Sequence, residues 1–213
     1  MSARQYSPFD RFLIEFELGL RTVFGRVSSA RPNPAGDYSE PTLSKEEQKH
    51  STGFLRVDHT GEVCAQALYR GQMLVARSSK TYDMLQAACE EELDHLAWTH
   101  ERLDELKGHR SYLNPYWYTH SFLIGVLAGL AGDRWSLGFV EETEKQVSRH
   151  LTDHLERLPQ ADLKSQKIAA QMREDEERHG HHANAAGGAH LPFMVKKLMA
   201  LQSKVMTSLA YYF

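Results

Sequence analysis

Cysteine is scarce in this chain of 213 residues, because only Cys64 and Cys89 are present. A disulfide framework is therefore excluded, and a reducing compartment is expected. Neither sign of charge dominates, since 25 basic and 28 acidic residues leave a formal charge of −3. A nucleic-acid-binding protein usually carries a basic stripe, so no nucleic acid is expected among the partners. A hydrophobic content of 41% is ordinary for a folded protein and excludes wholesale disorder.

Long hydrophobic runs and targeting signals are also missing. The longest apolar stretch, residues 122–132, stops at Asp133 and falls short of the roughly 20 residues that a spanning helix needs. Trp117 and Trp135 flank this stretch, so it fits either a buried helix or a helix lying in a membrane interface. The N-terminus lacks the basic and apolar regions of a secretory signal. No G-x-G-x-x-G motif is present, so a resident dinucleotide is not expected.

Apolar residues recur at helical spacing, and no alternating strand pattern is found, so the sequence predicts an all-α protein. Long helices are predicted at residues 44–78, 80–107, 121–158 and 162–186, with amphipathic helices at 8–27 and 193–213. Ser44 and Glu47 form a capping box at the start of the first long helix. Prolines between residues 31 and 41 indicate a linker. The predicted organisation is therefore an N-terminal helix and linker (1–43), a helical bundle (44–190) and a C-terminal amphipathic helix (191–213).

Acidic residues and histidines interrupt the apolar stripes of the four long helices. Two helices carry a Glu-x-x-His motif within the stripe, Glu92 with His95 and Glu176 with His179. Residues three apart share one helix face, so each pair directs a carboxylate and an imidazole to one point. The other two long helices each place a single acid in the stripe, Glu62 in one and Glu144 in the other.

The spacing of these acids repeats. Glu62 lies 30 residues before Glu92, and Glu144 lies 32 residues before Glu176. Two such hairpins, packed as an antiparallel four-helix bundle, bring four carboxylates and two imidazoles together, as in ferritin-like di-iron and di-manganese proteins. Glu141 and Glu142 remain alternatives on the third long helix, although the helical phase favours Glu144. Solvent-facing acids explain other carboxylates on these helices but not acids placed inside apolar stripes.

Several segments resemble the demethoxyubiquinone hydroxylase family. The first-helix signature of that family is similar to residues 56–72 (RVDHTGEVCAQALYRGQ). Further similar segments are 91–96 (EELDHL), 113–117 (LNPYW), 129–133 (GLAGD) and 138–144 (GFVEETE). The resemblance covers nearly the whole chain, and the layout is similar to that of bacterial members that have an N-terminal extension.

The resemblance implies a di-iron monooxygenase of ubiquinone biosynthesis that uses O₂ to hydroxylate the ring of a polyprenyl methoxy-methyl-benzoquinol. Two iron ions per chain would be the cofactor. Glu92 and Glu176 would bridge the irons, while Glu62 with His95 and Glu144 with His179 would complete the sites. The family implies peripheral attachment to the cytoplasmic face of the cell membrane, and other ubiquinone-biosynthesis proteins are possible partners. The quinol substrate can itself supply electrons, and the sequence does not identify an external electron donor.

Some residues and functions stay open at this point. His150 and His59 lie near Glu144 and Glu62 along their helices, and both are candidates for hydrogen bonds that orient metal ligands. Some family members place a tyrosine after the histidine equivalent to His150, whereas this chain has Leu151. Competing functions are iron oxidation and storage within the same fold, or a metal-free helical adaptor at a membrane.

Overall fold

The computed structural model of the protein describes residues 7–36 and 38–213, and within these ranges every regular element is a helix. The helices are α1 (Pro8–Phe24), α2 (Lys45–Val75), α3 (Ser79–Glu105), α4 (Asn114–Leu130), α5 (Asp133–Arg157), α6 (Leu163–Ala185) and α7 (Phe193–Ala210). The predicted all-α class is confirmed. The predicted capping box is also present, because the Ser44 and Glu47 side chains each accept a hydrogen bond from the other residue's backbone amide.

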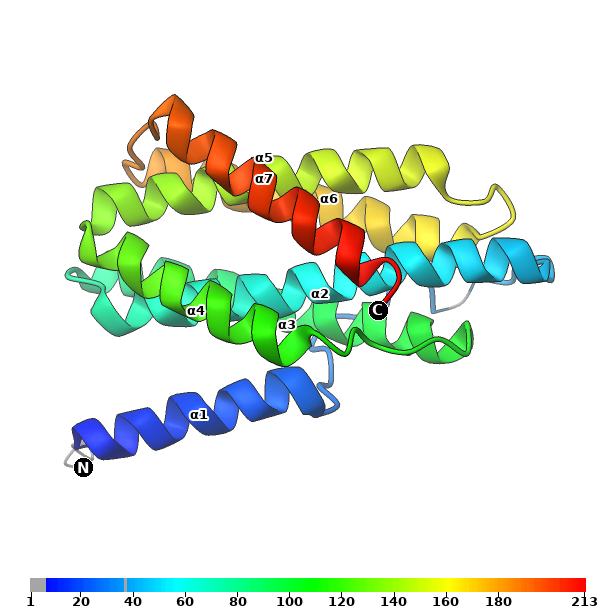
Figure 1. The fold of residues 1–213 in the computed structure, drawn as a ribbon, viewed down its shortest axis with the longest axis horizontal. Coiled ribbons are helices and arrows are strands. Elements are labelled where there is room, and N and C mark those ends of the chain that lie inside the picture. The colour runs from blue at the N-terminus through cyan, green and yellow to red at the C-terminus, as the bar shows by residue number, and fades with distance from the viewer. Residues whose placement is uncertain (1–6, 37) are drawn as a thin grey trace.

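Four long helices form the bundle. Helices α2 and α3 pack as one hairpin, α5 and α6 pack as the second, and the hairpins meet through α3 with α6 and α2 with α5. Figure 1 shows the two hairpins side by side, with α4 along α2, α7 running diagonally across the front, and α1 at the lower edge. This is the ferritin-like arrangement that the paired acids predicted.

The predicted single helix at 121–158 is wrong, because two helices occupy this region. Helix α4 begins at Asn114, and the chain breaks at Gly132 before α5 begins. Gly132 has a φ of 106°, a backbone conformation that suits glycine. The carboxylate of Asp133 accepts hydrogen bonds from the backbone amides of Arg77 and Ser78. These bonds hold the start of α5 against the turn between α2 and α3. The break coincides with the end of the apolar stretch at Asp133, where an apolar helix gives way to an amphipathic one.

Helix α4 packs closely against α2 through glycines. A methyl group added at Gly125 would lie 2.2 Å from the Leu68 carbonyl oxygen, and one at Gly71 would lie 2.2 Å from the Phe122 carbonyl oxygen. The opposite face of α4 exposes Leu127, which is 67% exposed. The apolar stretch is therefore neither a fully buried segment nor a free one, since one face packs on α2 and the other faces outward.

Two apolar clusters fill the bundle on either side of its middle. One contains Phe54, Trp98, Leu151 and Met172, and the other contains Tyr69, Leu85 and Val140. On each long helix, the acid identified from the sequence lies between the residues of the two clusters. The four acids therefore lie in the middle of the bundle, between the two apolar clusters.

The terminal segments lie against this bundle. The linker after α1 follows α3, with hydrogen bonds from Arg26 to Asp104 and from Asn33 to Glu101. At the other end, the Tyr211 hydroxyl lies 2.7 Å from His50 Nδ1, and Arg56 donates to the Tyr211 carbonyl oxygen. Among the described residues, no helix is both long enough and apolar enough to cross a membrane.

We predict that Gly125→Ala destabilises the protein by about 1–3 kcal/mol, because the added methyl group forces α4 away from α2. Gly61→Ala is the matched control, since a methyl group there meets no atom within 4 Å and alanine favours a helix by about 1 kcal/mol over glycine. Urea unfolding of both variants measures the difference. Equal stability of the two variants would contradict the close packing of α4 on α2.

Candidate metal centre

Six side chains from the four bundle helices converge at the polar centre. They come from α2 (Glu62), α3 (Glu92 and His95), α5 (Glu144) and α6 (Glu176 and His179), and each is at most 5% exposed. All six candidates from the sequence are therefore brought together. They form two groups, Glu62, Glu92, His95 and Glu176 on one side and Glu92, Glu144, Glu176 and His179 on the other. Within each group, one possible ligand atom per residue lies within 4.8 Å of the others.

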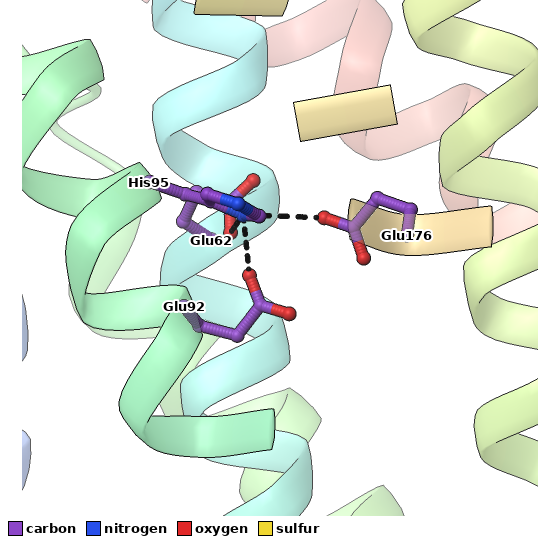
Figure 2. Close-up of side chains that lie close together, drawn as sticks. All are labelled: Glu62, Glu92, His95 and Glu176. Atoms are coloured by element: carbon purple, nitrogen blue, oxygen red, sulfur yellow. Dashed lines mark hydrogen bonds and ion pairs between the residues drawn. The ribbon is translucent and has the colours of Figure 1, made fainter. Parts of the chain in front are cut away.

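His95 directs one ring nitrogen into the first group. Its Nδ1 lies 2.9 Å from a Glu92 oxygen, 3.4 Å from a Glu176 oxygen and 3.6 Å from a Glu62 oxygen. Figure 2 shows the ring among these three carboxylates. The other nitrogen, Nε2, points away from the centre and lies 2.9 Å from Asp175 Oδ2. This carboxylate behind the imidazole fixes the ring orientation, which leaves Nδ1 as the possible ligand atom.

His179 occupies the equivalent position in the second group. Its Nδ1 lies 3.1 Å from a Glu92 oxygen and 3.5 Å from a Glu176 oxygen. Its Nε2 lies 3.3 Å from Glu91 Oε2. Both groups share Glu92 and Glu176, which is the arrangement that ligands bridging two metal ions need.

The donor set fits two divalent cations. Buried side-chain atoms with no hydrogen-bond partner include one oxygen each of Glu62, Glu92, Glu144 and Glu176, and both ring nitrogens of His179. Buried polar atoms without a hydrogen-bond partner are rare and destabilising, so a group of them in one place indicates a site for bound ions. Four ionised carboxylates carry the charge that two divalent ions neutralise. Oxygen and imidazole donors suit iron, although they do not by themselves select it.

The carboxyl groups of the centre differ in their affinity for protons. Burial raises the pKa of Glu62 well above its usual value, and the nearby charge of Glu92 adds to this. Burial and the charge of Glu176 raise the pKa of Glu144 in the same way. Burial acts on Glu92 too, but attraction to His95 and close contacts with both imidazoles outweigh it and hold the Glu92 pKa well below its usual value.

The imidazoles also hold protons in the absence of metal. Burial acts to lower the pKa of His95, but the charge of Glu92 and hydrogen bonds to the surrounding carboxylates raise it well above its usual value. Burial acts to lower the pKa of His179, but the nearby carboxylates of Glu176 and Glu92 raise it to about 11. Metal ions bind deprotonated ligands, so they must displace these protons.

The alternatives on α5 lie outside the centre. Glu141 pairs with Lys145 and accepts a hydrogen bond from Asn184, while Glu142 lies 3.1 Å from Lys196 Nζ. Glu144 is thus the acid of α5 that reaches the centre, as the helical phase favoured.

The two histidines considered as orienting groups lie apart from the centre. His59 is buried with its ring 5.8 Å from that of His100, and burial lowers its pKa to about 3, so it is neutral. His150 is partly exposed, and no hydrogen bond joins it to the centre within the described part of the chain. The group that orients His95 is instead Asp175, the residue before Glu176. Asp175 lies outside the apolar stripe of its helix, so the periodicity did not predict it. Its position beside the Glu-x-x-His motif was the signal that could have identified it.

An apolar cavity and a polar cleft flank the centre. The cavity has a volume of about 110 Å³ and is lined by residues of α2, α4, α5 and α7, among them Gly61, Ala65, Thr143 and Val147. These four residues flank Glu62 and Glu144 along their helices. The cleft has a volume of about 530 Å³ and lies between α5 and α6, where Glu144 and Glu176 line it beside Lys145, Arg149 and His181.

A bundle with two Glu-x-x-His helices and two further inward carboxylates defines the class of ferritin-like proteins with a carboxylate–histidine centre. Residues 49–210 match the family described as ubiquinone biosynthesis protein COQ7, and the chain belongs to this family. The resemblance recognised in the sequence is thereby confirmed.

Similar proteins named 3-demethoxyubiquinol 3-hydroxylase occur in several bacteria. The protein of Coxiella burnetii (strain RSA 493 / Nine Mile phase I) is 55% identical over 211 residues, which cover 99% of this chain and 98% of the relative. The protein of Polynucleobacter asymbioticus is 56% identical over 206 residues, 96% of this chain and 99% of the relative. The protein of Xanthomonas campestris pv. campestris (strain 8004) is 49% identical over 211 residues, 99% of this chain and 97% of the relative.

We predict that the metal-free protein loses stability between pH 6 and pH 8. The raised pKa values of Glu62 and Glu144 let the folded state keep protons that the unfolded chain releases above about pH 4.5. The raised values of His95 and His179 act in the same direction as the pH rises through and above 6.5. Each retained proton lowers the free energy of unfolding by about 1.4 kcal/mol per pH unit.

Urea unfolding of the metal-free protein at pH 6, 7 and 8 measures this slope. Iron affinity should change in the opposite direction and increase with pH, because binding releases the same protons. Stability that increases with pH in the absence of metal would contradict the protonation of the centre.

Proposed function

We propose that this protein is a di-iron monooxygenase that hydroxylates the ring of a polyprenyl methoxy-methyl-benzoquinol, demethoxyubiquinol, with O₂ in ubiquinone biosynthesis. The observation that carries the proposal is the buried centre of four carboxylates and two imidazoles. Relatives that are 49–56% identical over nearly the whole chain are named 3-demethoxyubiquinol 3-hydroxylase, which supplies the substrate and the reaction.

The ligand assignment follows the two groups. Glu62 and His95 would hold one iron, Glu144 and His179 would hold the other, and Glu92 and Glu176 would be shared by both. The iron centre, when reduced, supplies the binding and activation of O₂. The protein supplies the charge balance and an environment protected from bulk water by the apolar clusters at both ends.

The apolar cavity is the proposed site of the quinol ring. Its lining includes residues next to two of the proposed ligands in the sequence. These are Gly61 and Ala65, on either side of Glu62 in α2, and Thr143 and Val147, on either side of Glu144 in α5. An apolar wall suits the ring and the start of the tail. Polar side chains in the same wall, Ser121, Gln146 and Gln202, are available to hydrogen-bond to the oxygens of the ring.

A membrane surface is the proposed source of this water-insoluble substrate. Three helices expose large apolar side chains, including Phe12 and Phe16 of α1, Leu127 of α4, and Leu198 and Leu201 of α7. Helix α4 packs against α1 and α2, while α7 packs against α2 and α5, and the apolar cavity lies between α4 and α7. A prenyl tail could then pass from the bilayer into the cavity. We place the protein peripherally on the cytoplasmic face of the cell membrane.

Replacing a shared carboxylate should abolish iron binding and hydroxylation together. We expect Glu176→Ala to reduce iron from about two ions per chain to less than one, with no detectable product from demethoxyubiquinol. The matched control is Glu174→Ala, because Glu174 is an exposed acid on the same helix. Iron analysis, the optical spectrum and quinol turnover are measured on the same preparations. Turnover by an iron-free Glu176→Ala protein would contradict the di-iron assignment, and oxidation of iron without quinol turnover by the unsubstituted protein would favour iron storage.

The exposed phenylalanines of α1 should contribute to membrane binding. Phe12 and Phe16 are 63% and 57% exposed, and we expect Phe12→Ser/Phe16→Ser to weaken binding to vesicles of phosphatidylethanolamine and phosphatidylglycerol about 10-fold or more. Leu163→Ser is the control, since Leu163 is an exposed apolar residue at the start of α6. Vesicle sedimentation measures the bound fraction. Equal binding by the double variant and the control would remove α1 from the proposed membrane contact.

A further inference from the structure

The linker between α1 and α2 reaches the back of the metal centre through Arg31. The Arg31 Nε lies 2.6 Å from Asp94 Oδ2, and Nη2 lies 2.8 Å from Asp175 Oδ2. The guanidinium also lies over the Trp98 ring, with Cζ 4.9 Å from the ring centroid. The two aspartate side chains are 4% and 0% exposed. A single arginine therefore joins two buried carboxylates on different helices.

These carboxylates belong to the two Glu-x-x-His helices. Asp94 lies between Glu92 and His95 on α3, and Asp175 immediately precedes Glu176 on α6. The contact of Arg31 with Asp94 is reinforced by the Ala30 backbone amide, which donates to Asp94 Oδ1 at 2.6 Å. The linker is thus held to α3 by several hydrogen bonds, and it contacts α6 through the Arg31 side chain.

Asp175 is the residue that meets His95. The same Oδ2 atom lies 2.9 Å from His95 Nε2 and 2.8 Å from Arg31 Nη2. The other oxygen, Oδ1, accepts hydrogen bonds from Arg178 and Gln171. Both oxygens are therefore fully engaged, and Asp175 is held in the position that orients the His95 ring.

The contact behind His179, on the other side of the centre, is longer and more exposed to solvent than the contact behind His95. His179 Nε2 lies 3.3 Å from Glu91, whose side chain is 37% exposed and pairs with the partly exposed Arg178. His179 Nε2 has no hydrogen-bond partner, whereas His95 Nε2 has one. The polar cleft between α5 and α6 reaches this same side, since Glu144, Glu176 and Gly180 line it.

We propose that Arg31 is a positioning residue that makes the two metal positions differ in their rate of metal release. The ion beside His95 is released slowly, whereas the ion beside His179 is released quickly. This inference rests on the metal centre of the proposed function. A carboxylate behind a ligating histidine fixes the ring and strengthens its bond to the metal, and loss of such a group costs about 10–100-fold in metal affinity. Arg31 holds that carboxylate on one side only.

Release of ferrous iron to an excess of a coloured chelator, under anaerobic conditions, tests the proposal. The unsubstituted protein should release its iron in two phases of similar amplitude, one fast and one slow. Arg31→Gln should accelerate the slow phase about 10-fold, the lower end of the range for losing a supporting group, because Asp175 keeps its bonds to Arg178 and Gln171. The fast phase should not change. Arg31→Lys should show an intermediate rate, because one amine keeps the charge but cannot contact Asp94 and Asp175 as a fork.

The matched control is Arg26→Gln. Arg26 lies in the same linker and pairs with Asp104, but the two side chains are 80% and 48% exposed. This variant should release iron as the unsubstituted protein does. Thermal unfolding of the metal-free variants shows whether Arg31→Gln is folded, and Arg31→Lys decides the outcome if it is not.

Two results would overturn the inference: a single release phase in the unsubstituted protein, or release from the Arg31 variants that matches Arg26→Gln. Either result, obtained with protein that binds iron and hydroxylates the quinol, would leave the proposed function intact. Failure of the unsubstituted protein to bind iron would instead refute the proposed function.

Discussion

The burial of four carboxylates and two imidazoles in the middle of a helical bundle is the constraint on which the rest of the structure depends. An isolated buried charge costs several kcal/mol, so the cluster is tolerable only with protons or cations to balance it. In the absence of metal, raised pKa values keep protons on Glu62 and Glu144 and on both histidines. The two apolar clusters, which flank the centre, then have to stabilise the bundle around it.

The same constraint explains how one helix separates two environments. Successive residues of an α-helix point about 100° apart, so neighbours of Glu144 face different ways. Thr143 and Val147 line the apolar cavity, whereas Lys145 and Ser148 line the polar cleft. The apolar cavity and the polar cleft therefore lie on different faces of α5, and the cleft is the one that Glu144 and Glu176 line.

Much of the fold and of the centre was predictable, because both depend on periodicity along single helices. The phase of the apolar stripes selected Glu144 over Glu141 and Glu142, and the structure shows that the latter two pair with lysines instead. The break at Gly132 was not predicted although the apolar stretch ends there, because a change from apolar to amphipathic sequence does not by itself show that a helix stops, whereas the positive φ of Gly132 does. Arg31 was missed for a different reason. It lies in a proline-containing linker, where no periodicity indicates the direction of a side chain.

The sequence by itself determined the helical class, the two Glu-x-x-His hairpins and the identity of the six converging side chains, because hydrophobic spacing specifies which face of each helix is buried. The tertiary structure alone decided how α4 lies on α2, since glycines permit but do not require a close approach. It also decided that Asp175 and Arg31 support His95. Such contacts join residues far apart in the chain, and their geometry exists only once the helices have packed.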